Sequence, residues 1–277
     1  MQDVNANIDC PTVTGDLTIP TGLGGDVSIS GIKKVTGSVV VKENQGITGL
    51  TIGDLTEVGD TVDIQRNNVL GNIRMDKLDT INKLSLISLQ QLATIGFGSE
   101  GSTEAKTVEV SDTSLSDLSG LNLAKVDTLK ITTNSQLKMF NSDLKKIGDT
   151  LIFNKNGKNM EVNMTVLEEA QDITVAGSVA SFSVPSLKKI SALRFTDNPN
   201  LETFEAKNLT QVGANAKKTG SISFIGNDKL SNVSFPGVTK IFGDLTVKNN
   251  TAMSELNGFP KLETIFGALL IAGDFKE

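Results

Sequence analysis

The feature that most constrains this chain is a short pattern that recurs along almost all of its 277 residues. Two apolar residues are separated by one residue of any type, and an asparagine follows three positions after the second apolar residue. Another apolar residue comes three positions after that asparagine. The pattern is clear from Phe195 through Asn198 to Leu201, and again from Phe224 through Asn227 to Leu230. Apolar alternation followed by an asparagine is typical of a short strand that ends in a tight corner.

The spacing of this pattern predicts the fold. Successive repeats begin roughly 20 to 24 residues apart, with one longer gap before Ile222, which is the range of leucine-rich and β-solenoid repeats. One such unit cannot bury its apolar face, whereas stacked coils can. We therefore predict an all-β, right-handed parallel β-solenoid of leucine-rich, receptor L-domain-like repeats, with roughly a dozen coils of about 22 residues each. The first strand positions are Leu17, Val39, Val62, Leu84, Val108, Leu129, Leu151, Ile173, Leu193, Ile222, Leu245 and Leu269.

The recurring asparagines have two interpretations. A row of amides could bind a sugar or a cation, or each amide could bond backbone groups of its own and neighbouring turns. The asparagine recurs in phase with the apolar core and not in one local cluster, which favours a structural ladder. The repeat containing Asn156 departs from the pattern, because its next apolar position is occupied by Asn159. The predicted ladder consists of Asn44, Asn67, Asn134, Asn156, Asn198, Asn227 and Asn250.

The repeat runs almost from end to end without a linker, so we expect one domain. Residues 1–12 are predicted to be a trimmed N-terminal cap and 13–277 a single solenoid, with insertion loops near 96–104 and 213–219. Neither end has the features of a signal peptide or a polar cap, which indicates a mature fragment. The single cysteine, Cys10, is unpaired within this chain, and we expect its partner upstream.

Composition excludes several functional classes. The net charge of −6 argues against nucleic-acid binding. The absence of His, Trp and Tyr removes most metal-ligand sets, the His-dependent nucleophiles and the usual aromatic sugar platforms. No apolar run is long enough to span a bilayer. We therefore expect no catalytic residue, no cofactor, no metal and no enzyme activity.

A polysaccharide hydrolase or transglycosylase is kept as an alternative, because paired carboxylates on a β-solenoid can cleave glycans. Glu168 and Glu169 are adjacent in sequence, so their side chains are expected to point apart. Asp60, Asp63 and Asp244 lie in or near repeat strands, and no three acids recur at one position of neighbouring coils. A hydrolase would need two carboxylates about 5–10 Å apart in a groove.

The outward position of the main strand varies in character from coil to coil. Such a mixed face is compatible with contact to protein or glycan. The residues at this position are Thr18, Val40, Asp63, Ser85, Glu109, Lys130, Ile152, Thr174, Arg194, Ser223, Thr246 and Leu270. Four sequons make Asn163, Asn208, Asn232 and Asn249 candidates for N-glycosylation.

Four segments, taken in order, carry a family resemblance. They are Gly15-Asp16-Leu17-Thr18-Ile19 near Cys10, residues 110–115 (VSDTSL), residues 184–190 (VPSLKKI), and Asn249-Asn250-Thr251 followed by residues 256–262 (LNGFPKL). The chain resembles the fungal GPI-anchored cell-wall organisation proteins, the extracellular-mutant and sporulation-specific wall protein family, over nearly its full length. Members of this family are built from receptor L-domain-like leucine-rich repeats.

The resemblance implies a secreted, N-glycosylated protein at the cell wall or outer plasma-membrane surface, without known catalytic residues. It implies a role in wall organisation and integrity, with wall glycans or wall mannoproteins as partners. Membrane attachment is expected only through a GPI anchor that this chain does not include. The second alternative is an L-domain-type recognition module for a protein or peptide, which would expose an apolar patch of roughly several hundred Å².

Overall fold

The computed structural model describes residues 3–98, 102–213 and 220–275. The chain forms two compact units, Met1–Leu137 and Lys138–Glu277. Both are parallel β-solenoids, and together they contain about 11 turns of about 23 residues each, which confirms the predicted fold class. In the described ranges no helix is long and apolar enough to cross a membrane. Part of the loop predicted near 96–104 and most of that near 213–219 lie outside the described residues.

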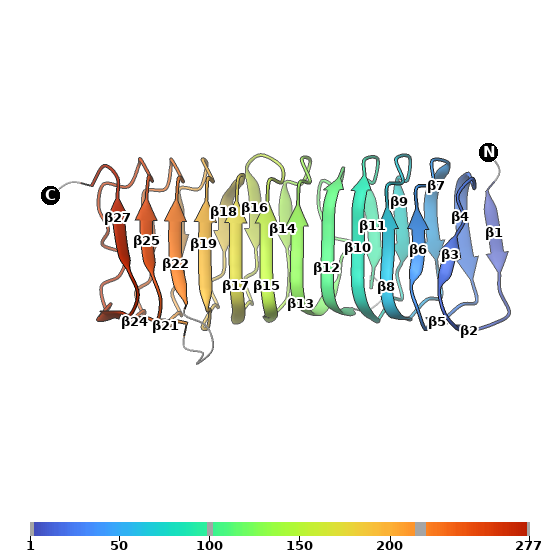
Figure 1. Cartoon of the computed structure of the whole chain (residues 1–277), viewed down its shortest axis with the longest axis horizontal. Coiled ribbons are helices and arrows are strands. Elements are labelled where there is room, and N and C mark those ends of the chain that lie inside the picture. The colour runs from blue at the N-terminus through green and yellow to red at the C-terminus, as the bar shows by residue number, and fades with distance from the viewer. Residues whose placement is uncertain (1–2, 99–101, 214–219, 276–277) are drawn as a thin grey trace. The chain divides into compact units, whose positions relative to one another are not determined.

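The first unit contains a main sheet and a smaller sheet, both with parallel pairing (Figure 1). The main-sheet strands are β2 (Thr12–Val13), β3 (Leu17–Ile19), β5 (Lys34–Val35), β6 (Val39–Lys42), β8 (Glu57–Gln65), β10 (Thr80–Leu89), β12 (Thr103–Thr113) and β13 (Leu123–Thr132). The smaller sheet contains β1 (Val4–Asn7), β4 (Gly25–Ser30), β7 (Ile47–Ile52), β9 (Asn72–Met75) and β11 (Thr94–Phe97). Strand β1 lies within the region predicted as a cap and pairs with β4.

The second unit also has a main sheet, which is accompanied by three smaller sheets. Its main sheet contains β15 (Lys146–Asn154), β17 (Glu169–Ala176), β19 (Ala192–Thr196), β22 (Ser221–Ile225), β25 (Leu245–Lys248) and β27 (Leu269–Ala272). Three smaller sheets contain β14 (Met139–Asn141), β16 (Met160–Asn163) and β18 (Val179–Ser183); β20 (Thr203–Glu205) and β23 (Asn232–Ser234); and β21 (Gln211–Val212), β24 (Lys240–Ile241) and β26 (Thr264–Ile265).

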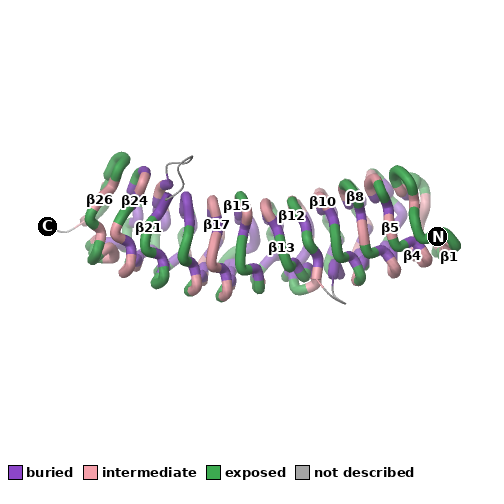
Figure 2. The backbone as a smooth tube through the Cα atoms, turned by 90° about the horizontal axis from the view of Figure 1, so that it is seen from below, coloured by how far each residue is buried: buried purple, intermediate pink, exposed green. Residues whose placement is uncertain are grey.

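The core of each unit is a set of apolar columns that cross the coils. Pairing in register places Val62 beside Leu84 and Leu84 beside Val108, so that equivalent residues stack on one another. In the second unit the apolar column includes phenylalanine rings. Phe195 stacks on Phe224, with ring centroids 5.2 Å apart. Buried and exposed segments alternate along the coils of both units, as Figure 2 shows. Burial therefore follows the period-two alternation that the sequence contains.

The corner asparagines are buried and bond the backbone of the preceding coil. The Asn227 amide nitrogen donates to Phe195 O at 3.1 Å, and the Asn227 backbone N–H donates to Asn250 Oδ1 at 3.0 Å. In the first unit, the Asn67 amide nitrogen donates to Val41 O at 2.8 Å, and Asn67 Oδ1 accepts from the Asn44 backbone N–H at 2.8 Å. Each side chain thus satisfies backbone groups that the tight corner removes from the sheet ladder.

A left-handed backbone residue precedes every ladder asparagine, with φ between +51° and +67°. These residues are Glu43, Arg66, Thr133, Lys155, Asp197, Gly226 and Asn249. The same conformation recurs at Ser88, Asp112 and Gly177, so the following residues Leu89, Thr113 and Ser178 occupy the ladder position in coils without asparagine. Thr113 keeps part of the ladder, because its hydroxyl donates to Asn134 Oδ1 at 2.8 Å. The buried Ser178 hydroxyl oxygen has no hydrogen-bond partner within the described residues.

The irregular repeat at Asn156 is explained by one additional residue in its corner. Met160, not Asn159, is the buried apolar residue of this coil. Asn159 adopts φ +60°, and its Oδ1 accepts a hydrogen bond from Asn200 Nδ2 at 2.7 Å. The additional residue is accommodated outside the core, and the apolar column continues.

Asn227→Ala should lower the free energy of unfolding by about 1–3 kcal/mol, because buried backbone groups of two coils lose their partners. Urea-induced unfolding followed by circular dichroism would measure the change. The matched control is Asn232→Ala, an exposed asparagine, which should stay within about 0.5 kcal/mol of the parent. Equal stability of the Asn227 variant and the parent would refute a structural role for the ladder.

Candidate functional site

A concave region lies at the same repeat position in each unit, where a short corner segment leads into the main strand. The second-unit groove has a volume of about 670 Å³ and is lined from Lys146 to Gln211 by four neighbouring segments. The first-unit groove has a volume of about 460 Å³ and is lined from Glu57 to Asp127. Each groove lies within one unit, so each can be described by its own coils.

Just before the main strand, some coils contain a two-residue bulge where other coils have a single residue. The grooves lie where consecutive coils have the single residue. In β8, Gly59 and Asp60 separate Val58 from Thr61, whereas in β10 a single residue separates Ile81 from Lys83. The strand register shifts at this point. Strands β12 and β13 continue the shorter path without a further shift here. We attribute the concavity to the shorter path of these coils.

The second unit shows the same change between β15 and β17. Two residues, Gly148 and Asp149, separate Ile147 from Thr150, whereas Gln171 alone separates Ala170 from Asp172. The bulged position favours glycine because neighbouring coils approach closely: a Cβ at Gly59 would lie 2.2 Å from Thr36 O. Coils without the bulge place a side chain there, such as Gln171 or Ser191, and these side chains line the groove.

A row of opposite charges crosses the second-unit groove. Glu169 lies in register with Lys146 on one side and Lys189 on the other. The ammonium of Lys189 is 2.6 Å from the Glu169 carboxylate, and that of Lys146 is 3.1 Å from it. The hydrogen bond from Lys189, followed by that from Lys146, lowers the pKa of Glu169. The same hydrogen bond raises the pKa of Lys189, so the pair is charged at neutral pH.

Uncharged polar groups continue the lining of the second-unit groove. The Gln171 amide donates to Gly148 O at 2.5 Å, and Asn208 Nδ2 donates to Pro185 O at 2.8 Å. Thr210 and Gln211 are exposed at the far end. The groove therefore presents ammonium, amide and hydroxyl donors beside carboxylate and amide acceptors.

The two grooves differ in charge. The first-unit groove is lined by Glu57, Glu104 and Asp127 against Lys106 and Lys125, three acids and two bases, for a formal charge of −1. The lining of the second-unit groove contains Lys146, Lys188 and Lys189 against Glu169, for a formal charge of +2. Lys188 is also paired with Glu168 at 3.0 Å, just outside that lining. The two grooves therefore differ in electrostatic character.

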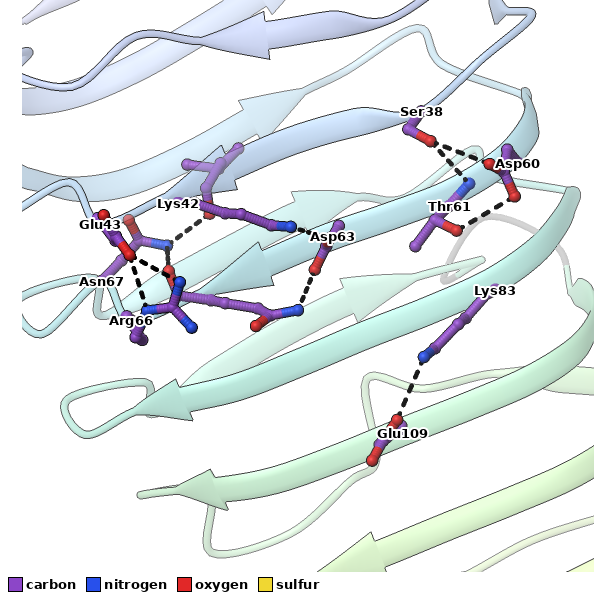
Figure 3. A network of polar contacts seen from close by, with 12 residues as sticks. Ser38, Lys42, Glu43, Asp60, Thr61, Asp63, Arg66, Asn67, Lys83 and Glu109 are labelled. Carbon is purple, nitrogen blue, oxygen red and sulfur yellow. Dashed lines mark hydrogen bonds and ion pairs between the residues drawn. The ribbon is translucent and has the colours of Figure 1, made fainter.

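The outward face of the main sheet in the first unit is occupied by ion pairs between coils (Figure 3). Lys42 pairs with Asp63, and Lys83 lies 3.3 Å from Glu109. Asp63 also accepts from Gln65 Nε2 at 2.5 Å. Ser85 differs from the other residues of this row, because it is buried and its hydroxyl oxygen has no hydrogen-bond partner in the described residues. The charges of Lys42, Asp63, Lys83 and Glu109 on this face are therefore already paired with one another.

The adjacent acids considered for hydrolysis, Glu168 and Glu169, are held by lysines on neighbouring coils. Glu168 pairs with Lys188, and Glu169 with Lys146 and Lys189. A general acid of a glycosidase needs a raised pKa, whereas Glu169, Asp54 and Asp117 all have a lowered pKa. For Asp54 the main cause is the hydrogen bond from the Gly31 backbone, and for Asp117 that from the Ser119 hydroxyl. Within the described ranges, no three potential ligands cluster as a metal site.

The four sequons occupy different environments. Asn163 is half-buried and donates to Asn141 Oδ1 at 3.0 Å. Asn208 lines the second-unit groove. Asn232 and Asn249 are exposed. Cys10 is exposed too, with its thiol directed at Thr12 O at 3.2 Å, and both its disulfide partner and the use of the sequons stay predictions.

The repeat pattern alone does not reveal the grooves, although the sequence contains a signal for them. The spacing from the buried corner residue to the first main-strand position is four in bulged coils, as from Val58 to Val62. It is three in groove coils, as from Ala170 to Ile173. A run of coils with the shorter spacing marks each groove.

Comparison with known proteins places the chain among fungal surface proteins. Among curated proteins, it is 31% identical over 276 residues to the cell surface GPI-anchored protein of Arthroderma benhamiae, covering 99% of this chain and 69% of that protein. The chain belongs to this family of fungal cell-surface GPI-anchored proteins. This confirms the resemblance drawn from its repeats.

Two further relatives have the same character. The chain is 27% identical over 246 residues to protein ecm33 of Aspergillus fumigatus, covering 88% of the chain and 60% of the relative. It is 28% identical over 275 residues to the cell wall mannoprotein PST1 of Saccharomyces cerevisiae, covering 99% of the chain and 59% of the relative. The chain thus spans about three fifths of these two family members. No protein-family model matches the chain, and no solved structure matches it.

Gly59→Ala should destabilise the fold by about 1–3 kcal/mol, because the added methyl group would meet the Thr36 carbonyl oxygen. Gly53→Ala is the matched control: a Cβ there meets no atom within 4 Å, and its backbone is not left-handed. It should change stability by less than about 0.5 kcal/mol. Chemical denaturation of both variants measures the difference, and similar unfolding midpoints would contradict the proposed constraint on the bulge.

Lys189→Ala should raise the pKa of Glu169 toward its ordinary value of 4.5, because the strongest hydrogen bond to the carboxylate is removed. In the parent, a lowered carboxyl pKa means that the charged form is favoured by folding. The resulting stabilisation is present above the ordinary value and is lost as pH falls through the lowered one. Carbon-13 NMR titration of the Glu169 carboxyl group measures both pKa values. An unchanged midpoint in the variant would show that Lys189 does not set it.

Proposed function

We propose that the chain is a non-enzymatic, extracellular protein that supports organisation and integrity of the fungal cell wall. In the full-length protein a GPI anchor would hold it at the wall or the outer membrane surface. The observation that carries this proposal is the 31% identity over 99% of the chain to a fungal cell surface GPI-anchored protein. The partners we propose are wall glycans or wall mannoproteins.

The distribution of charged groups supports a scaffold more than an enzyme. Hydrolysis requires an acid with a raised pKa and a second carboxylate in one groove. The carboxyls with a shifted pKa are all lowered, and Glu169, which lies in a groove, is held by two lysines. The first-unit groove does contain two carboxylates, Glu57 and Glu104, on coils separated by one other coil. The hydrolase alternative therefore predicts that these two residues are needed for activity.

The distribution of apolar side chains also supports a scaffold over an L-domain-type recognition module. The large apolar side chains that are exposed in the described residues are Met139 and a group in the last coil, Phe266 and residues 269–271. On β27, Leu270 belongs to the outward row of the main sheet, whereas Leu269 and Ile271 alternate with it and lie on the other face of the strand, and Met139 lies on β14. A protein-binding patch on a coil face would need several such side chains side by side. The leucine-rich-repeat and receptor L-domain likeness itself stays a prediction.

Deletion of the gene should make fungal cells more sensitive to wall-binding dyes, and the parent full-length gene should restore resistance. A triple variant, Glu57→Gln with Glu104→Gln and Asp127→Asn, should restore it equally, because a scaffold needs no acid catalyst at these positions. Immunoblots of wall extracts control for abundance. Normal abundance with no restoration would favour the hydrolase alternative, and normal resistance in the deletion strain would oppose the wall role.

A further inference from the structure

We propose that the second-unit groove binds an extended, uncharged polysaccharide chain through hydrogen bonds alone. This inference rests on the proposed extracellular function, because it assumes that the protein meets wall polysaccharides. It goes further by assigning one site, one class of ligand and the residues that contact it. The contact residues are Lys146, Glu169, Gln171, Lys189 and Gln211.

The polar groups of the groove match the chemistry of a sugar. Each hydroxyl of a hexose can donate one hydrogen bond and accept two, so it pairs well with a donor and an acceptor that lie side by side. Glu169 supplies an acceptor between the ammonium groups of Lys146 and Lys189. Gln171 and Gln211 add amides, each of which has both kinds of group. These mutual ion pairs hold the long side chains in place before a ligand arrives, which lowers the entropy cost of binding.

The spacing of the coils matches a repeating ligand. Parallel strands lie about 4.8 Å apart, and a hexose in an extended glycan advances by a similar distance. Lys146, Glu169 and Lys189 occupy one register position on three neighbouring coils. Two residues further along the same coils, Gly148, Gln171 and Ser191 also occupy equivalent positions. Successive sugars of a chain running across the coils would therefore meet equivalent pairs of positions.

The same groups argue against a peptide or a polyanion as the occupant. A peptide is usually anchored by apolar side chains in desolvated pockets. None of the large apolar side chains that are exposed in the described residues lines this groove. A polyanion needs unpaired cations, whereas Lys146, Lys188 and Lys189 each lie within 3.1 Å of a glutamate oxygen. A hydroxyl-rich neutral chain uses these pairs without breaking them.

Asn208 provides an independent check, because this sequon asparagine lines the groove. An N-glycan at this position would occupy the space that the proposal gives to an external polysaccharide. Asn208 Nδ2 already donates to Pro185 O at 2.8 Å. The proposal therefore requires Asn208 to be unmodified in the secreted protein, whatever the state of the other sequons.

The test uses the 277-residue chain from a host that adds no N-glycans. Hexasaccharides of β-1,3-glucan, β-1,6-glucan, chitin and mannan are titrated against it by calorimetry and by ¹H–¹⁵N NMR. We expect saturable binding of at least one. The double variant Glu169→Gln with Gln211→Ala should weaken that binding by about tenfold, as expected for the loss of two hydrogen bonds. Lys240→Ala is the matched control, since Lys240 lies in register with Gln211 on the next coil but outside the groove.

Several results would overturn the inference. They are no binding of any hexasaccharide, equal weakening by the Lys240 variant, or a double variant that binds as well as the parent. NMR spectra of each variant show whether it is folded. Lys125→Ala, in the first-unit groove, should leave binding unchanged, and a large loss there would place the site elsewhere. A glycopeptide map of the secreted protein that shows a glycan on Asn208 would also refute it.

The outcomes for this site and for the proposed function can be separated. If the parent gene restores wall resistance but the chain binds no hexasaccharide, the groove assignment fails and the wall role stands. If the chain binds through Glu169 and Gln211 but the full-length protein is absent from wall extracts, the wall role fails and the groove assignment stands.

Discussion

The structure depends on how each coil satisfies its backbone where the chain turns. A left-handed residue such as Arg66 or Asp197 reverses the chain and takes peptide groups out of the sheet ladder. The following asparagine replaces the lost bonds: the Asn198 amide donates to Val175 O at 3.1 Å and to Thr196 O at 3.1 Å. Because an amide contains both a donor and an acceptor, one residue per coil can bond in both directions along the stack. The apolar columns can only form in register once these corners are closed.

The grooves follow from a second constraint at the opposite end of the main strand. In a bulged coil, Gly59 allows two coils to approach closely and the corner contains one additional residue. In a coil without the bulge, the single residue at this corner has a side chain. Loss of the bulge over consecutive coils therefore changes shape and chemistry together: it makes a hollow and fills its lining with side chains such as Gln171. Most asparagine corners are constrained by the buried backbone groups that they bond, whereas the corner before the main strand takes either one or two residues in this chain. This second corner is therefore a position at which such a coil can gain side chains for binding.

Most of the fold could be predicted from the sequence, but the site could not. Period-two alternation and the recurring asparagine are local signals, so the coils, their register and the corner positions follow from them. Thr113 and Ser178 were missed because they occupy the ladder position without being asparagine, and only the backbone conformation before them identifies it. Asn159 was assigned to an apolar position because one additional residue shifts the corner, and only Met160 packing shows where it enters. The grooves depend on a difference of one residue between coils. A repeat pattern allows its spacing to vary by this much, so the difference does not stand out.

The two polar surfaces of the solenoid explain why binding is better placed in a groove than on the flat sheet. On the outward face of the first unit, Lys42 and Asp63 lie on adjacent strands and neutralise each other, and a ligand lying there would bury its surface on one side only. In the second-unit groove the ion pairs of Glu169 line a concave wall, so a chain lying in it can be contacted from more than one direction. A groove without aromatic rings gains little binding free energy per sugar, because no ring stacks on the sugar. Tight binding then depends on several sugars that contact equivalent coils at the same time. In the proposed groove, weak contacts repeated along a polymer would suit a protein that organises wall chains better than one that selects a single small ligand.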